Sequence, residues 1–238
     1  FRRAFVKGNI GDATITAGRQ AFTVGHGYVA DLTGDAIKAD FGKKLKTTMF
    51  AGRFDSVMYD GDNDRATLYG VAFSYPFDEK FYTELAFYAQ EGKEYNEQKI
   101  YSAGLGYKFD KNIEIYGEYQ KASKTLGKFW SDDYIGDRGD DGWAATLSYK
   151  GAKLSEKGSW GAYVTYYDQS AAVMLDSISE IEDYFYYNEG MKGYEIGVDY
   201  VLAKNILANV SYYDMDNKDW ADYDDGAKML WTNVTFNF

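Results

Sequence analysis

The sequence predicts an all-β chain folded as an antiparallel transmembrane β-barrel. Apolar and polar side chains alternate with a period of two from Thr67 to the last residue, which is the pattern of β-strands. Tyr, Trp and Phe lie mostly at the ends of the apolar faces, with smaller apolar residues between them. The segments are about 9 to 11 residues long, the length that a tilted strand needs to cross a membrane.

Thirteen strands are expected, in chain order. The first two form a hairpin over residues 2–9 and 13–20, and the next two flank a turn at residues 42–44. The other nine alternate clearly, over residues 67–77, 81–88, 101–109, 113–119, 143–149, 160–166, 194–200, 206–212 and 230–238.

The connections alternate in length, which places short turns at one end of the barrel and long polar loops at the other. The turns are expected at residues 11–12, 42–44, 78–80, 110–112 and 203–205, with a longer one at 151–158. The loops are expected at residues 21–33, 56–64, 91–98, 123–141, 170–190 and 215–227.

Residues 1–238 are expected to form a single, N-terminally incomplete barrel domain. The first and last strands both run towards the short turns, whereas bacterial single-chain barrels have an even number of strands. We therefore expect one or three strands to be missing before Phe1.

Composition excludes several other functions. The chain has no Cys and one His, so neither thiol chemistry nor a histidine metal cluster is expected. A net charge of -11 argues against a nucleic-acid partner. His26 has no evident serine partner for catalysis, and the acidic segments 60–64 and 214–217 lack the closing Glu of a calcium loop. No enzymatic activity, cofactor or metal is predicted.

The first hairpin, RRAFVKGNIGDATITAGRQ at residues 2–20, resembles a hairpin of Gram-negative general porins. The resemblance implies a barrel of about 16 strands with three missing here. It also implies that Arg19 projects into the pore constriction, and that residues 21–33 replace the loop that folds inward. This loop is shorter than in general porins and lacks their P-E-F-G-G motif.

The Lys/Asp-rich turns and Tyr-rich strands of this chain are most similar to those of the OmpM-type porins of diderm Firmicutes. Those proteins join a barrel to a periplasmic S-layer homology stalk. The similarity implies a possible tether to the cell wall through a domain absent from this chain. The residues Val234, Phe236 and Phe238 resemble the C-terminal assembly signal of outer-membrane barrels.

Charge is distributed unevenly, and this predicts a basic wall opposite an acidic one. Residues 1–53 carry nine Lys or Arg against four Asp, whereas the remainder is strongly acidic. Acidic side chains on the polar faces of strands must face the lumen, because lipid would disfavour them. The expected acidic lining is Glu84, Glu114, Glu118, Glu195 and Asp199. The expected basic lining is Arg19, Arg2, Arg3, Lys38, Lys46 and Arg53.

These features predict a passive diffusion porin of the cell outer membrane that admits small hydrophilic solutes and ions, with weak cation selectivity. Two alternatives stay open: an oligosaccharide-selective channel, and a structural barrel that tethers the membrane to the cell wall. Lumen tyrosines could form a sugar-stacking track or fill space. A homotrimer is expected, because the outward faces of the first strands, read as Thr14, Thr16 and Gly18, are weakly apolar.

Overall fold

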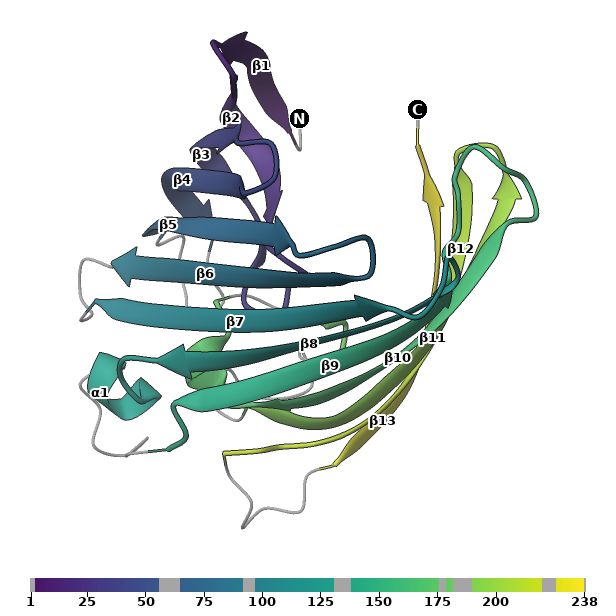
Figure 1. Cartoon of the computed structure of the whole chain (residues 1–238). Coiled ribbons are helices and arrows are strands. Elements are labelled where there is room, and N and C mark those ends of the chain that lie inside the picture. The colour runs from purple at the N-terminus through teal and green to yellow at the C-terminus, as the bar shows by residue number, and fades with distance from the viewer. Residues whose placement is uncertain are drawn as a thin grey trace.

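The computed structural model describes residues 3–55, 65–91, 97–130, 138–175, 179–181, 190–219 and 226–237, which form one curved antiparallel sheet (Figure 1). The strands are β1 (Ala4–Ile10), β2 (Ala13–Thr23), β3 (Asp31–Phe41), β4 (Lys46–Asp55), β5 (Arg65–Pro76), β6 (Phe81–Glu91), β7 (Gln98–Lys108), β8 (Ile113–Ala122), β9 (Asp141–Lys150), β10 (Trp160–Gln169), β11 (Met191–Ala203), β12 (Ile206–Asp216) and β13 (Ala227–Phe236). The predicted fold class and the thirteen strands are confirmed. Helix α1 (Leu126–Trp130) and the 3-10 helix η1 (Ala171–Val173) were not predicted.

Every strand pairs with its neighbour in the chain, so the sheet is a continuous meander from β1 to β13. The first and last strands form its two edges and do not pair with each other (Figure 1). The sheet curls towards closure without completing a barrel within the described residues. Neither helix in this part of the chain is long and apolar enough to cross a membrane.

The two faces of the sheet differ in character because successive side chains of a strand point to opposite sides. The register aligns Leu147 with Val164 and Val164 with Ile196, and these three side chains are exposed. They lie on the convex face, which carries a belt of exposed apolar residues. The alternate residues, such as Tyr116 and Tyr167, lie on the concave face and are buried. This alternation is the one that the sequence predicted.

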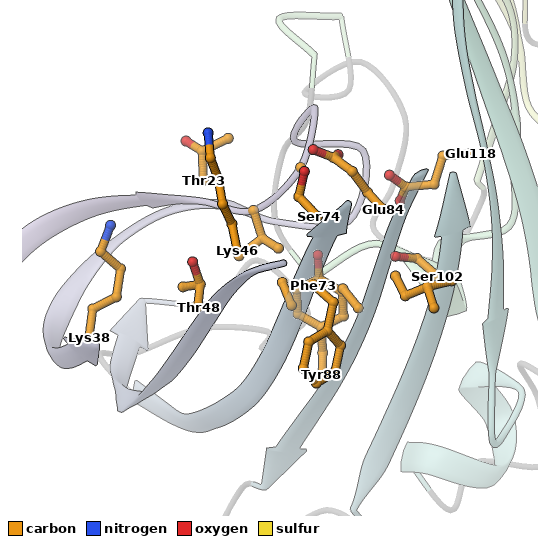
Figure 2. A pocket seen from close by; sticks show the side chains of 15 residues that line it. Thr23, Lys38, Lys46, Thr48, Phe73, Ser74, Glu84, Tyr88, Ser102 and Glu118 are labelled. Carbon is orange, nitrogen blue, oxygen red and sulfur yellow. The ribbon is translucent and has the colours of Figure 1, made fainter. Parts of the chain in front are cut away.

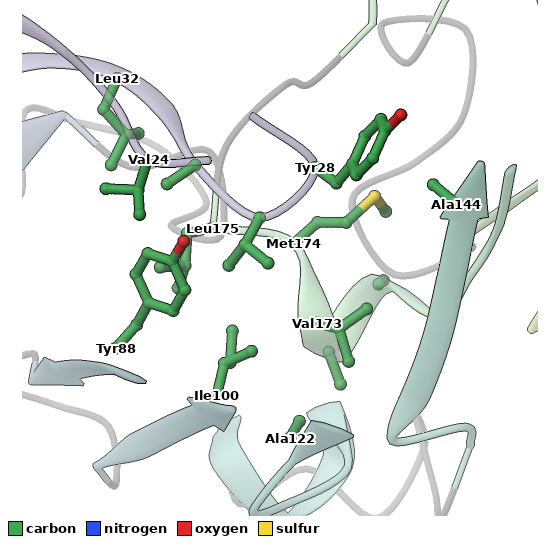
Figure 3. Close-up of a cluster of buried hydrophobic side chains, with 14 of the residues drawn as sticks. Val24, Tyr28, Leu32, Tyr88, Ile100, Ala122, Ala144, Val173, Met174 and Leu175 are labelled. Carbon is green, nitrogen blue, oxygen red and sulfur yellow. The ribbon is translucent and has the colours of Figure 1, made fainter. Parts of the chain in front are cut away.

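The interior is partly filled by two stretches that fold in from the long-loop end. The first inner segment, residues 24–30, connects β2 to β3, and the second inner segment, residues 171–175, follows β10. Figure 3 shows Tyr28 and Val24 beside Met174 and Leu175, above the strands of the concave face. Much of both segments is buried in one apolar cluster. The expected polar loop 170–190 therefore begins with an apolar stretch that packs inside the sheet.

Hydrogen bonds fix the two inner segments to each other and to the wall. The amide of Leu175 donates to the carbonyl of Val29 at 2.8 Å. The Tyr28 hydroxyl lies 2.5 Å from that of Thr146, and the Gln169 side-chain amide donates to the Tyr28 carbonyl at 2.8 Å. These contacts join strands β9 and β10 to a segment more than 100 residues earlier in the chain.

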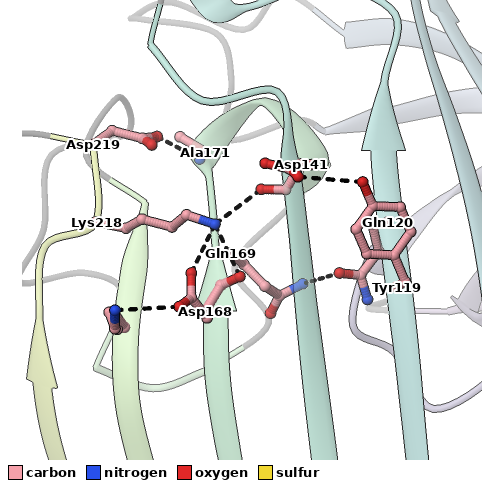
Figure 4. A network of polar contacts seen from close by, with 9 residues as sticks. Tyr119, Gln120, Asp141, Asp168, Gln169, Ala171, Lys218 and Asp219 are labelled. Carbon is pink, nitrogen blue, oxygen red and sulfur yellow. Dashed lines mark hydrogen bonds and ion pairs between the residues drawn. The ribbon is translucent and has the colours of Figure 1, made fainter.

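A polar network fastens the ends of three neighbouring connections near η1 (Figure 4). The Lys218 ammonium contacts the Asp168 carboxylate at 2.7 Å and donates to the carbonyl of Asp141 at 3.0 Å. The backbone N–H of Ala171 donates to the Asp219 carboxylate at 2.9 Å. The start of the second inner segment is therefore anchored to the residues that follow β12.

The outward face of the first strands differs from the sequence prediction. The register aligns Thr16 with Lys38 and Gly18 with Ala36, and Thr16 is buried on the concave face. Thr14, which aligns with Asp40, lies on the same face. Thr14, Thr16 and Gly18 therefore face inward and do not weaken the outward face of β2, contrary to the prediction.

Candidate functional site

A cavity of about 270 Å³ lies on the concave face, between the first inner segment and the wall formed by β3 to β8. Strands β3 and β4 contribute Lys38 and Lys46, which Figure 2 shows on one side. Strands β6 and β8 contribute Glu84 and Glu118 on the other. A basic wall therefore faces an acidic one across a small space.

A second cavity of about 290 Å³ shares Lys46, Ser74 and Glu84 with the first. Its lining adds His26 from the inner segment, and Lys108 and Glu114 from the short-turn end of the sheet. The two cavities follow one another along the same wall. Together they extend along the wall beside the first inner segment, from Lys38 and Glu118 to Lys108 and Glu114 near the short turns.

The acidic wall is organised by tyrosines that lie across glycines of the neighbouring strand. A Cβ atom at Gly104 would overlap the ring of Tyr116, and one at Gly106 would overlap that of Tyr82. Glycine at these positions lets each ring lie along the wall, so that its hydroxyl reaches a carboxylate.

The tyrosine hydroxyls act as donors to the glutamates of this wall. The Tyr116 hydroxyl donates to Glu118 at 2.8 Å and to Glu84 at 3.2 Å. The Tyr82 hydroxyl donates to Glu114 Oε1 at 2.5 Å. Hydrogen bonds to a carboxylate stabilise its charged form, which offsets part of the cost of holding it away from water.

His26 contacts this tyrosine layer from the inner segment. Its ring stacks on that of Tyr116 with centroids 3.6 Å apart, and its Nε2 lies 3.2 Å from the Tyr82 hydroxyl. Burial lowers the pKa of His26, whereas Glu84 and Glu114 act in the opposite direction. The ring thus packs the inner segment against the wall.

The other two acidic residues predicted for the lumen lie farther round the concave face, on β11. Glu195 is buried and accepts hydrogen bonds from the hydroxyls of Tyr163 at 2.5 Å and Tyr167 at 3.0 Å. Asp199 accepts one from the Asn209 amide at 2.9 Å. All five predicted acids are thus on the concave face, and their role in permeation stays a prediction.

The predicted basic residues divide between the two faces. Lys38 and Lys46 line the first cavity, whereas the register aligns Arg19 with Asp35 and Asp35 with Arg53 on the convex face. The expectation that Arg19 and Arg53 face the pore is therefore corrected. Their neighbours along the strands on that side are residues such as Ala17, Ile37 and Ala51, and Arg19 instead pairs with Asp35 at 3.5 Å.

The remaining predicted residues lie at the two ends of the chain. Arg3 is exposed just before β1, and Arg2 lies outside the described residues. Val234 and Phe236 are exposed on the convex face of β13, and Phe238 again lies outside the described residues. An assembly role for these C-terminal residues remains a prediction.

The described part of the chain offers no clustered site for a metal ion. No cluster of three or more His, Cys, Asp or Glu side chains suited to a metal ion occurs in the described part of the chain. The acidic segment 60–64 lies outside it. Asp214, in the other acidic segment, pairs with Lys228 at 3.0 Å and accepts a hydrogen bond from Tyr194.

Trp231 was not predicted to face the interior, yet it aligns with the buried Ser211 on the concave face. Its neighbours Leu230 and Thr232 point to the convex side, and they belong to the alternating row that the sequence pattern emphasised. Val234 faces outward, and successive strand residues alternate between the two faces. Counting back three positions from Val234 would have identified Trp231 as an inward residue.

The fold is similar to that of solved outer-membrane β-barrels. Pseudomonas aeruginosa OpdQ has a similar structure, with a TM-score of 0.56 and 12% identity over 97% of this chain and 67% of that one. OpdL of the same organism gives 0.57 and 13% over 97% and 69%. A loop L8 deletion mutant of OmpT, an outer membrane protein of Vibrio cholerae, gives 0.55 and 14% over 97% and 80%.

The chain spans about two thirds of the length of these Pseudomonas structures. No protein-family model matches the sequence, and no curated protein matches it either. At such low identity the structural similarity establishes the fold, and the function must be argued from this chain's own residues.

Proposed function

We propose that this chain forms the barrel of an outer-membrane porin, through which small hydrophilic solutes and ions diffuse passively. The observation that carries the proposal is the charged route along the concave face, where Lys38 and Lys46 face Glu84 and Glu118. A wall of this polarity on the inside of a belt of exposed apolar residues is suited to water within and lipid outside.

The opposed charges would act directly on a passing solute. Positive and negative side chains on facing walls create a field across the route, which orients polar molecules. Apolar solutes gain no electrostatic stabilisation from this field that would offset the cost of displacing water. The proposed channel therefore favours small polar solutes by this field and does not need to bind them at one site. The proposal involves no catalytic residue.

The test is conductance of the purified protein in a planar lipid bilayer. We expect stable ion-conducting steps whose size increases with salt concentration, since the ions cross through water. A protein that inserts fully and conducts no ions would refute the channel, and would favour the structural alternative.

We also propose that copies of the chain associate as a homotrimer through the convex surface of β2 to β5. The charged pair of Arg19 and Asp35 lies on this surface, where lipid would disfavour it. Next to it is an apolar groove of about 460 Å³ whose lining includes Ala39, Ala51 and Gly70. A neighbouring copy could fill the groove and shield the ion pair from lipid. A monomer in native mass spectrometry from mild detergent would contradict this.

The two edge strands support a further proposal, that additional strands complete a barrel of about 16. Unpaired backbone groups at a sheet edge are not tolerated in hydrocarbon, so β1 and β13 need partners there. The OmpM-type relationship and a cell-wall tether are likewise proposals. Co-sedimentation of the full-length protein with purified peptidoglycan would test the tether.

A further inference from the structure

A separate chamber of about 540 Å³ lies on the concave face beside β10 to β13. Its lining shares no residue with the two cavities that follow β3 to β8. Residues of β10 to β13 form most of it, and Asp31 at the start of β3 completes it together with Ser179 and Glu180. The chamber has the volume of a typical small-molecule site.

The floor of this chamber is held by a continuous set of hydrogen bonds. Tyr163 lies across Gly197, donates to Glu195 and is 3.1 Å from the Ser211 hydroxyl. The Ser211 hydroxyl in turn donates to the side-chain oxygen Oδ1 of Asn209 at 3.0 Å, while the side-chain nitrogen Nδ2 of Asn209 donates to Asp199. These side chains are fixed before any ligand arrives, which reduces the entropy cost of binding.

Two side chains of β13 face the same space, and their hydrogen-bonding groups have no partner among the described residues. The register places Trp231 opposite Ser211 and Asn233 opposite Asn209, so both project from the concave face. Neither side chain forms a hydrogen bond with another part of the described chain.

The combination of groups indicates a class of ligand. An indole ring offers a flat apolar surface to the C–H face of a pyranose, and its N–H remains available as a donor. The Asn233 amide both donates and accepts, as the hydroxyls of a sugar require, and Glu180 adds an acceptor. Among the described residues, no Lys or Arg lines the chamber, so an acidic sugar would lack a counter-charge there.

We propose that this chamber is a binding subsite for neutral saccharides, with Trp231 as the stacking platform and Asn233 as the main hydrogen-bonding group. The subsite adds a binding step to the proposed diffusion function. It lies apart from the route between the lysines and glutamates. Sugars would thus be retained on one side of the inner segments, while ions pass on the other.

The test is isothermal titration calorimetry of the detergent-solubilised protein with maltotriose and cellotriose. We expect one of these sugars to bind, and Trp231→Ala to weaken that binding roughly tenfold, the scale of one lost aromatic contact. Asn233→Ala should weaken it as well, with less disturbance of packing. Trp143→Ala, at a tryptophan on the convex face, is the matched control and should bind as the wild type does.

Two outcomes would overturn the subsite. One is an absence of heat with both sugars. The other is binding of 1,4-diaminobutane in their place, which would make the chamber a site for organic cations attracted by its carboxylates. Conductance is measured separately, so an ion-conducting protein that binds no sugar refutes the subsite alone. A protein that binds sugar without conducting refutes the channel alone.

Discussion

A shift of one position along a strand decides whether a basic residue faces the interior or the surrounding membrane. Lys38 and Lys46 reach the cavity, whereas Arg19 and Arg53 occupy the convex face with Asp35 between them. All four were predicted from the sequence to form the basic lining of the pore. Their positions differ because alternate side chains of a strand lie on opposite faces.

Replacing Lys46 by Glu should increase the preference of the channel for cations. The change removes one positive charge and adds one negative charge beside Glu84, in the space that both cavities share. We expect a clear shift of the reversal potential in a salt gradient, which decreases as ionic strength rises.

Arg19→Glu is the matched control, since it makes the same charge change on the convex face. It should leave the reversal potential close to that of the wild type. A larger shift in the Arg19 variant than in the Lys46 variant would show that the two faces are assigned wrongly.

Asp219 should make stability depend on pH. Burial raises the pKa of this carboxyl group from 3.8 to about 6. The folded state therefore holds a proton more tightly than the unfolded state. The stability that this protonation contributes is complete below pH 3.8 and is lost as the pH rises through about 6. Urea unfolding midpoints measured between pH 4 and 7 should show the decline. In Asp219→Asn, which stays neutral, that part of the slope should disappear.

At the scale of secondary-structure elements, tyrosines lying across glycines shape the inner wall. Tyr82, Tyr116 and Tyr163 each cover a glycine on the next strand and each donate to a glutamate. The arrangement keeps the wall flat and places carboxylates at fixed positions. It also explains why glycines are frequent on polar faces of these strands, where sequence patterning alone reads them as spacers.

Gly197→Ala should destabilise the barrel by about 1–3 kcal/mol, because the added methyl group would overlap the Tyr163 ring and force it from its position. Gly117→Ala is the control. A Cβ atom there meets its nearest neighbour at 3.8 Å, an ordinary contact. Urea titrations of both variants folded into vesicles would compare them, and equal stability would contradict the proposed role of the glycine.

Gln169→Leu should loosen the first inner segment, since it leaves the Tyr28 carbonyl without its donor at a cost of about 1–3 kcal/mol. We expect larger current fluctuations in bilayer recordings. Gln90→Leu is a control at another buried glutamine, whose side-chain nitrogen has no partner within the described residues. Unchanged recordings for Gln169→Leu would mean that other contacts hold the segment.

The alternation of apolar and polar residues predicted nine of the thirteen strands, because one face of each strand meets lipid and the other does not. The hairpin at residues 2–20 and the turn at residues 42–44 supplied the other four strands. The alternation also gave all five acidic residues their correct face. It failed for β2, whose convex side mixes Ala17 with Arg19 and so shows no contrast. The inner segments were also missed in part, since their burial depends on contacts with distant strands. The apolar run 171–175 inside a polar loop was the available signal.

At the scale of the whole molecule, the apolar convex belt determines where the sheet can reside. Leu147 lies in the middle of this belt, aligned with Ile115 and Val164, while the adjacent Ser148 faces inward. Leu147→Lys should destabilise the protein in bilayers by about 2–4 kcal/mol, as a cation at the midplane requires. Ser148→Lys should be tolerated, and urea titration in vesicles would measure both. Equal losses would mean that Leu147 does not face lipid.

The contacts between the two inner segments also imply an order of assembly. Each strand pairs with the one before it, so hairpins can form as soon as their residues are available. The bonds from Gln169 to Tyr28 and from Leu175 to Val29 join residues well over 100 positions apart, and they need the sheet to have curled first. The interior should therefore be filled last. An intermediate with paired strands and an empty, wider lumen should precede the native barrel.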